Sequence, residues 1–372
     1  MARLGDIATY INGYAFKPSD WSEQGLPIIR IQDLTGNSYQ ANHYNGKYDT
    51  KYEVVPGDVL ISWSASLGIY VWQGEKALLN QHIFKVVFDK IDVDKSFFIH
   101  QLESILDKAK GDAHGATMKH LTKPVFDALP FYLPSKENQV QIATELNTVC
   151  KLIEQRKEQI SKLDELIKAR FVERFGDTTL NPFGWEKDSL GAVCDVRDGT
   201  HDSPKYYEIG YPLVTSKNVA GGKIDLTDCS LICEADFNKI NERSKVDIGD
   251  IIMPMIGTVG NPVIVDTEAN FAIKNVALIK FKNNSRVLNI YIRALLRSDY
   301  FDDAVLSKVR GGTQKFISLG DIRKLEVLIP PMELQEHFVA FVEQVDKSKL
   351  EIQQSLEKLE TLKKSLMQQY FG

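Results

Sequence analysis

The chain has 372 residues, 43% of them apolar and 26% charged, and its 45 lysines and arginines nearly balance 50 aspartates and glutamates. This composition is typical of a folded protein of two or three domains and excludes a disordered chain, a collagen and a minimal disulfide scaffold. The net charge of −5 gives no overall attraction to phosphate, so nucleic-acid binding would have to depend on local basic patches.

The first residues and the cysteines bear on the compartment. Residues 1–6 lack the apolar core of a signal peptide, and the sequence contains no apolar run long enough to cross a membrane. The four cysteines form no CxxC pair, which favours reduced thiols over disulfides or a zinc site. We therefore expect a cytoplasmic protein.

Residues 1–134 are predicted to form a mainly β domain. Short β-like runs, such as 27–31, 58–63 and 83–88, are separated by Gly and Asp at turn spacing. One helix is expected near residues 95–109.

Residues 135–176 are predicted to form one long helix. Ser135 is a candidate N-cap after Pro134, and Gly176 follows Phe175 as a terminating glycine. Apolar positions alternate at spacings of four and three, which indicates a heptad seam. The seam consists of Ile142, Leu146, Val149, Ile153, Arg156, Ile160, Leu163, Ile167 and Arg170. Residues 137–175 as one helix would extend about 58 Å, too long for an ordinary globular core.

The second half repeats this order. Residues 177–330 show further β-like runs, such as 275–280, and one helix is expected near 287–304. Residues 331–372 are predicted to form a second long helix, with Pro331 in its first turn and Gly372 as its terminating glycine. Its seam is interrupted by Lys349 and Lys363 and otherwise contains Phe338, Val342, Val345, Ile352, Leu356, Leu359 and Leu366.

The chain is therefore a tandem duplication. The offset between the copies drifts from 186 to 192 in the β-rich regions and is constant at 196 from Thr117 to Gly176. Hairpin tips tolerate insertions, whereas one extra residue rotates a packed helix by about 100°. We expect an α+β fold in which two mainly β domains are each followed by a long helix, the helices pair as a coiled coil, and the halves are related by a pseudo-twofold tandem repeat.

Two candidate DNA-binding places recur in both copies. The first is the turn at 115–121 and at 311–317, where small residues, a hydroxyl and a lysine at a helix start are typical of phosphate binding. Lys308, Arg310, Lys315, Arg323 and Lys324 stand near the second turn against Asp321 alone. The candidate contacts are Thr117, Lys119, Arg310, Thr313, Gln314 and Lys315. An ordinary capped turn with solvated lysines is an equally good interpretation.

The second place is the strand end at 30–33 and 215–218, with the hairpins at 63–68 and 255–260. Arg, Lys, Gln and Asn there match the hydrogen-bonding pattern of base edges. The candidate contacts are Arg30, Gln32, Trp63, Ser64, Lys217, Asn218 and Thr258. Aligned positions carry different residues, so two such surfaces would read different sequences. The alternative is that these polar residues only form turns.

Catalytic motifs are absent from the sequence. It contains no GxGxxG, Walker A or HExxH motif, and the histidines show no metal-ligand spacing. The run Asn181-Pro182-Phe183-Gly184 partly matches a methyltransferase motif but lacks its second proline, and we interpret it as a turn. The chain reads as a binding protein that contains no catalytic or metal residues.

The duplicated layout, with Leu4-Gly5-Asp6-Ile7 near the start, 311–315 as a Gly-Thr-Gln-Lys turn and Pro331 at a helix entry, resembles the specificity subunit of type I restriction-modification enzymes. This resemblance implies two target-recognition domains that read a bipartite, asymmetric DNA site, with the helices setting the gap between the half-sites. It also implies that the chain binds no cofactor itself and docks two methyltransferase subunits and restriction translocase subunits. S-adenosylmethionine, ATP and Mg would belong to those partners. The helix entries carry Asn138-Gln139 and Leu334-Gln335 where the family tends to show Glu-Gln.

Two other classes stay open. A coiled-coil scaffold or adaptor would show no salt-sensitive DNA binding. A lone methyltransferase or nuclease would show activity as the purified chain.

Overall fold

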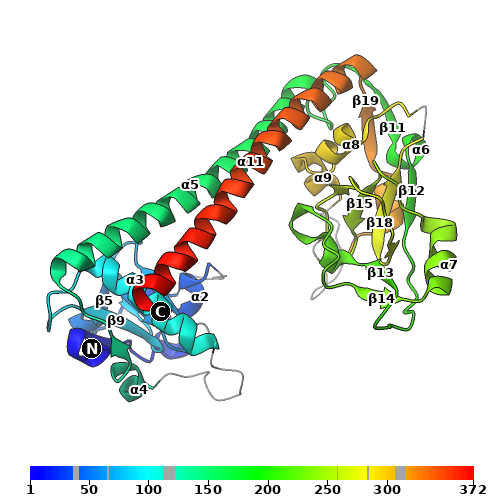
Figure 1. The fold of residues 1–372 in the computed structure, drawn as a ribbon. Coiled ribbons are helices and arrows are strands. Elements are labelled where there is room, and N and C mark those ends of the chain that lie inside the picture. Colours follow the sequence, from blue (N-terminus) through cyan, green and yellow to red (C-terminus); the bar gives the residue numbers. More distant parts are fainter. Residues whose placement is uncertain (37–41, 65–66, 112–121, 258, 283–284, 306–315) are drawn as a thin grey trace. The chain divides into compact units, whose positions relative to one another are not determined.

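A computed structural model of the chain describes residues 1–36, 42–64, 67–111, 122–257, 259–282, 285–305 and 316–372 (Figure 1). The chain forms two compact units. Unit 1 comprises Met1–Arg156 and Ser355–Gly372, and unit 2 comprises Lys157–Gln354.

The elements of the first half are β1 (Ala2–Arg3), α1 (Leu4–Ile7), β2 (Thr9–Asn12), η1 (Pro18–Asp20), β3 (Leu26–Ile29), α2 (Ile31–Leu34), β4 (His43–Tyr44), η2 (Thr50–Tyr52), β5 (Glu53–Val54), β6 (Val59–Ser62), β7 (Gly68–Val71), β8 (Ala77–Leu79), β9 (Ile83–Val87), α3 (Lys95–Gly111), α4 (Lys123–Asp127), β10 (Pro130–Phe131) and α5 (Lys136–Phe175).

The elements of the second half are β11 (Glu186–Ser189), α6 (Leu190–Val193), β12 (Asp195–Asp198), β13 (Tyr211–Val214), η3 (Ser216–Gly222), β14 (Ser230–Ile232), α7 (Glu234–Ser244), β15 (Ile251–Pro254), β16 (Val263–Ile264), β17 (Ala272–Ile273), β18 (Val276–Lys280), α8 (Asn289–Leu295), α9 (Asp299–Ala304), α10 (Leu319–Arg323), β19 (Glu326–Ile329) and α11 (Met332–Phe371).

The two units have equivalent sheets, which confirms the predicted α+β tandem repeat. Unit 1 contains a sheet of order β2-β9-β6-β7, and unit 2 contains its counterpart β12-β18-β15-β16. A second sheet of order β4-β3-β8-β5 corresponds to β14-β13-β17, with β3·β8 and β13·β17 pairing in parallel. The small ribbon β1-β10 corresponds to β11-β19. The duplication seen in the sequence is therefore a duplication of topology.

The main difference between the units explains the drift in offset. Residues 45–58 of unit 1 contain η2 and β5, whereas the corresponding connection of unit 2 contains the helix α7. This connection is longer in unit 2, and α7 packs against β17 where β5 pairs with β8 in unit 1.

The predicted strands at 58–63, 83–88 and 275–280 are confirmed as β6, β9 and β18. The strand predicted at 27–31 is β3, which ends at Ile29, and the helix α2 begins at Ile31. The helix expected at 95–109 is α3, but the one expected at 287–304 is broken into α8 and α9. The break lies between Leu295 and Asp299, where Ser298 is the N-cap of α9 with an extended backbone and its hydroxyl donates to the carbonyl oxygen of Leu295 at 2.6 Å.

Each long helix begins and ends one residue inside its expected range, α5 at Lys136 and Phe175 and α11 at Met332 and Phe371. Ser135 caps α5, since its hydroxyl accepts the N–H of Asn138 at 3.4 Å. Gly176 ends the helix with a left-handed φ of 78°, a conformation that glycine adopts without strain. The seam positions of both helices are all buried or half-buried, which confirms the heptad pattern.

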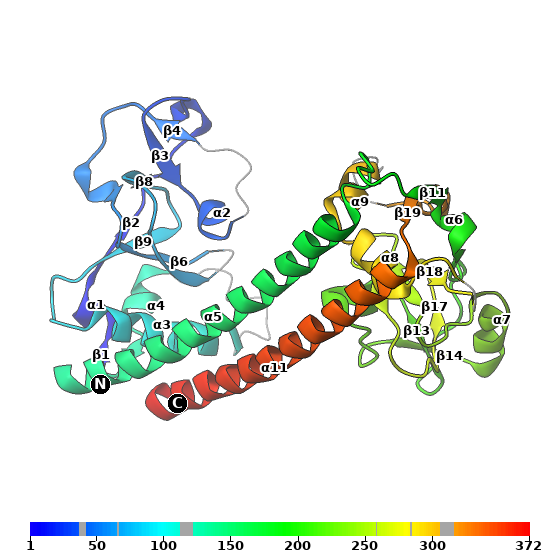
Figure 2. The same ribbon diagram turned by 90° about the horizontal axis from the view of Figure 1, so that it is seen from above.

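Each unit includes one end of both long helices (Figures 1 and 2). In unit 1, Ile142 and Leu146 of α5 share a core with Phe371 of α11, which packs on Phe97 with ring centroids 5.6 Å apart. In unit 2, the end of α5 shares a core with the start of α11, and Phe175 packs on Tyr291 at 4.8 Å. The boundaries between the units consequently fall inside the helices, at Arg156/Lys157 and Gln354/Ser355, because the end of each helix completes the core of a globule.

The lysines that interrupt the second seam form ion pairs. In unit 2, Lys349 of α11 lies 2.5 Å from a carboxylate oxygen of Asp164 on α5. In unit 1, Lys363 lies 3.6 Å from Glu103 on α3. The lysine stems lie along the half-buried seam while their ammonium groups reach neighbouring carboxylates.

Candidate nucleic-acid interface

In each unit the ends of several strands meet at one place, which we call the strand-end edge. In unit 1 it comprises residues 12–14, 29–32, 62–64 and 80–82, and in unit 2 residues 198–201, 214–218, 254–256 and 274–275. The N–H of Tyr14 donates to Leu79 O at 2.9 Å, and that of Thr200 to Ile273 O at 3.0 Å. The same backbone bonds therefore build the edge in both units.

A glycine is required at the same point of each edge. A Cβ on Gly13 would lie 2.0 Å from Asn80 O, and one on Gly199 would lie 2.2 Å from Ile273 O. Neither approach is sterically allowed, so only glycine lets β2 and β12 end this close to the neighbouring connection. The two glycines place the side chains before them, Asn12 and Asp198, at the edge.

The strand-end edge of unit 1 is rich in aromatic and amide groups. The indole N–H of Trp63 donates to Oδ1 of Asn12 at 3.1 Å, and its ring packs on His82 with centroids 4.9 Å apart. The guanidinium of Arg30 lies 5.8 Å from the ring centroid of Trp21, which is 46% exposed. Exposed aromatic rings and an arginine are groups that contact bases by stacking and hydrogen bonding.

The strand-end edge of unit 2 is charged. Asp198 is buried, and its two carboxylate oxygens have different partners. One accepts from Nε2 of His201 at 2.8 Å, and the other is paired with the guanidinium of Arg243. The other ring nitrogen of His201 lies 2.9 Å from Oδ1 of Asn275, which has a left-handed backbone. Both ring nitrogens thus face oxygen acceptors, an arrangement that favours the doubly protonated imidazolium.

The pKa of His201 agrees with this geometry. It is raised above its ordinary value, chiefly by the hydrogen bond to Asn275 and next by the bond to Asp198. The charge of Asp198 acts in the same direction, while desolvation and the positive charge of Arg243 oppose it.

The sequence-predicted contacts of the second candidate place lie at or beside these edges. Arg30, Gln32, Trp63 and Ser64 belong to the edge of unit 1, and Lys217 and Asn218 to that of unit 2. Lys217 is exposed, whereas Ser64 is buried. Asn218 is also buried, and its Oδ1 accepts from the N–H and the hydroxyl of Thr215 at 3.0 and 2.9 Å. That oxygen caps the turn, so the structure argues against Asn218 as a base contact.

The predicted contacts of the first candidate place lie outside the described residues, namely Thr117, Lys119, Arg310, Thr313, Gln314 and Lys315. Thr258, predicted for the second place, also lies outside them. In unit 2, the two residues that directly follow position 315 lie at the strand-end edge. Phe316 bridges Ile256, and the N–H of Ile317 donates to Met255 O at 2.9 Å.

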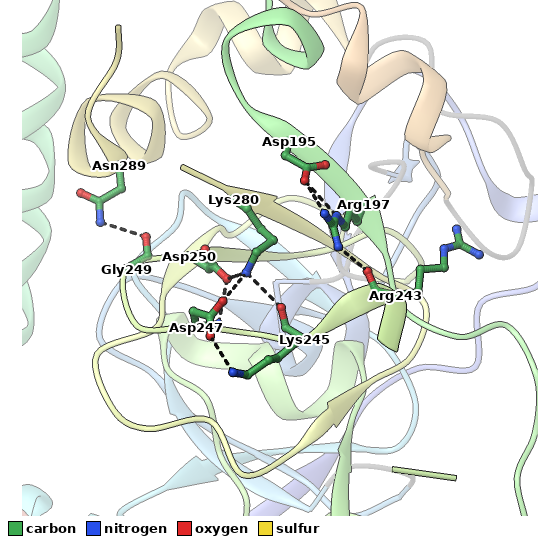
Figure 3. A network of polar contacts seen from close by, with 9 residues as sticks. All are labelled: Asp195, Arg197, Arg243, Lys245, Asp247, Gly249, Asp250, Lys280 and Asn289. Carbon is green, nitrogen blue, oxygen red and sulfur yellow. Dashed lines mark hydrogen bonds and ion pairs between the residues drawn. The ribbon is translucent and has the colours of Figure 1, made fainter. Parts of the chain in front are cut away.

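A second charged network of unit 2 lies at the opposite ends of the same strands (Figure 3). Lys280, at the end of β18, lies 2.5 Å from Asp250 and 2.9 Å from Asp247. Burial raises the pKa of the Asp250 carboxyl, and the lysine hydrogen bond holds the pKa of Asp247 below its ordinary value.

This network holds a turn at Gly249, whose carbonyl oxygen accepts from Asn289 at 2.9 Å. In unit 1 Gly57 stands at the same point, and its carbonyl oxygen accepts from Lys95. The network stabilises the fold, and we do not assign it to the interface.

Asn12, His82, Asp198, His201 and Arg243 were not predicted from the sequence. A signal existed for Asn12 and Asp198, since Asn12-Gly13 and Asp198-Gly199 align at the offset of 186. Arg243 gave no such signal because it belongs to α7, in the connection that differs between the units.

The run Asn181-Pro182-Phe183-Gly184 is a turn, as expected. Asn181 and Gly184 both have a positive φ, and Oδ1 of Asn181 accepts the N–H of Trp185 at 2.9 Å. Among the described residues no group of His, Cys, Asp and Glu is arranged to hold a metal ion. No helix in the described part of the chain is long and apolar enough to span a bilayer.

Comparison with known proteins identifies the family. The model of the type I restriction modification DNA specificity domain matches residues 1–163 and again 182–364. The chain is 23% identical over 402 residues to the specificity subunit of the type I restriction enzyme EcoBI of Escherichia coli, covering 99% of this chain and 84% of that one. It is 24% identical over 392 residues to the MjaVIII specificity subunit of Methanocaldococcus jannaschii, covering 99% and 90%.

Solved structures show the same fold. The type I restriction-modification S subunit of M. genitalium superposes with a TM-score of 0.54 at 13% identity, covering 98% of this chain and 94% of that chain. A chain from a structure of the type I R-M system gives a TM-score of 0.51 at 17% identity, covering 100% and 96%.

Proposed function

The chain belongs to the type I restriction modification DNA specificity family, and we propose that it reads a bipartite, asymmetric DNA site, one half-site with each unit. The observation that carries this proposal is the pair of equivalent strand-end edges with unlike side chains. Trp63, His82 and Asn12 cluster at one edge, and Asp198 and His201 at the other. Two edges with the same backbone arrangement but different side chains would contact different base sequences, as an asymmetric target requires.

We further propose that the chain itself is not catalytic. The strand-end edges hold side chains suited to DNA contact, and the sequence contains none of the catalytic motifs sought. The reaction would then belong to partners, namely two methyltransferase subunits and restriction translocase subunits. S-adenosylmethionine, ATP and Mg would bind to those partners, and the assembly would act on DNA in the cytoplasm.

The long helices would set the gap between the half-sites. Each has 40 residues, which corresponds to about 60 Å at 1.5 Å per residue. This length exceeds one turn of duplex DNA, about 34–36 Å, so the half-sites would be separated by base pairs that are not read.

Methylation-aware sequencing of DNA from cells that express the chain with its methyltransferase subunits tests the proposal. A methylated split motif, with two unlike halves and an unread gap, is the expected result. Methylation that requires no split motif, or that persists without this chain, would refute it. A scaffold without DNA binding would also leave the purified chain without salt-sensitive retention on DNA.

Two engineered chains test the arrangement of the half-sites. Exchanging residues 1–134 for the corresponding domain of another family member should change one half-site only, and a change in both would contradict modular reading. Inserting one heptad between Arg156 and Lys157 and another between Gln354 and Ser355 keeps the seams in phase. Each insertion adds about 10 Å of helix, so the unread gap should lengthen by about three base pairs. An unchanged gap would contradict the role of the helices as a spacer.

A further inference from the structure

Arg243 combines an exposed guanidinium with a buried anchor. Its side chain is 68% exposed, whereas the side chain of its partner Asp198 is only 9% exposed. A carboxylate buried to this extent holds the guanidinium in a fixed direction. An exposed arginine normally loses much rotamer freedom on binding, and this anchor removes part of that cost before DNA arrives.

The backbone of Arg243 is held as well. Its carbonyl oxygen accepts from the guanidinium of Arg197 at 2.7 Å, and Arg197 is itself bound to Asp195 at 2.6 and 3.0 Å (Figure 3). Figure 3 shows the side chain of Arg243 extending away from these residues. Arg243 is therefore fixed at both ends, at the C-terminal end of α7.

We propose that Arg243 reads a guanine in the half-site bound by unit 2, and that Asp198 and His201 are its positioning residues. This inference rests on the proposed function. An arginine has five N–H donors in a planar fork, and the described contacts of Arg243 use only part of them. Two parallel donors match O6 and N7 of guanine in the major groove.

A base edge fits this arrangement better than a phosphate does. The charges of Asp198 and Arg243 offset each other, and the imidazolium of His201 directs its two N–H groups to Asp198 and Asn275. The guanidinium is therefore the group of this cluster that can meet DNA, and the edge of guanine offers its fork two acceptors. A phosphate contact sets the register of the protein on the duplex and carries no sequence information, whereas a fork held in one direction can select a single base.

The position of Arg243 in the fold suits a specificity residue. It lies on α7, which stands where unit 1 has η2 and β5. The element that carries it therefore differs between units that otherwise share their topology, and a residue there can change one half-site without changing the other.

The test uses the full chain in complex with its methyltransferase subunits and a randomised DNA pool from which bound sequences are read. For Arg243→Ala and Arg243→Lys, we expect the preference for guanine at one position of one half-site to fall by roughly 5- to 150-fold, with the other half-site unchanged. Lys245→Ala is the matched control, because Lys245 is 70% exposed, is paired with Asp247 and lies near the opposite ends of the strands. It should leave both half-sites unchanged.

Replacing the mapped guanine by 7-deazaguanine removes the N7 acceptor and tests direct contact. It should weaken binding of the unmodified chain and have little effect on Arg243→Ala. An unchanged guanine preference in both arginine variants would overturn the proposal, and so would a uniform loss of affinity over all sequences, which indicates a phosphate contact. If the unmodified chain selects no split motif, the proposed function itself fails.

Discussion

The side-chain oxygen of Gln335 accepts the backbone N–H of Leu288 at 2.9 Å, which joins the start of α11 to the N-cap of α8. The amide nitrogen of Gln335 donates to the carbonyl oxygens of Pro330 and Arg286, both at 2.9 Å. In unit 1, Gln139 makes the same link to Asp94 at 2.8 Å. One buried glutamine in each copy thus ties a long helix to the globule before it.

Replacing Gln335 by alanine should lower the free energy of unfolding by about 3 kcal/mol. The change leaves a buried N–H and two carbonyl oxygens without their partner, and each such loss is costly. Urea denaturation of the full chain measures the effect. Gln344→Ala, at an exposed position of the same helix, should change stability by less than about 0.5 kcal/mol. Equal effects of the two substitutions would show that the buried link adds nothing.

The ion pair of Lys349 with Asp164 should contribute modestly to stability. The lysine side chain is 19% exposed and the carboxylate 48%, so solvent and salt screen their attraction. A double-mutant cycle with both residues changed to alanine should give a coupling energy of about 0.5–1 kcal/mol that decreases in 1 M salt. A coupling near zero at low salt would mean that the lysine only fills the seam.

The raised pKa of His201 predicts a pH dependence. A raised pKa in the folded state means that this histidine stabilises the fold below its ordinary pKa and loses that contribution as the pH rises through the folded value. Asp198 faces the imidazole from β12 and Arg243 from α7. Asp202 follows His201 in the chain, and Lys274 precedes its partner Asn275.

NMR titration of the His201 ring in the full chain measures this pKa. Asn275→Ala removes the contact that contributes most and should lower it. An unshifted value in the unmodified chain would contradict the doubly bonded imidazolium.

Gly199→Ala should destabilise unit 2. Its Cβ would lie 2.2 Å from the carbonyl oxygen of Ile273, so β12 or its neighbour must move, at a cost of about 1–3 kcal/mol. Gly320→Ala is the control, because the nearest atom there is 3.6 Å away and the position is helical. Thermal unfolding compares the two, and a tolerated Gly199→Ala would show that the edge adapts to a side chain.

The sequence alone determined the repeat, the long helices and the class of protein. Heptad spacing and a constant offset identify α5 and α11 because helix periodicity is local, and the ends at Ser135 and Gly176 follow from capping chemistry. The break between α8 and α9 was not predicted, since an apolar pattern continues across Ser298.

Only the tertiary structure decided which residues share a site. Arg243 lies 45 residues from Asp198, and Asn275 lies 74 residues from His201. No local pattern links such distant positions. The structure also showed that Asn218, whose residue type suits base reading, is buried as a cap. The physical reason is that periodicity and capping depend on neighbours along the chain, whereas a recognition edge depends on which strand ends the sheet brings together.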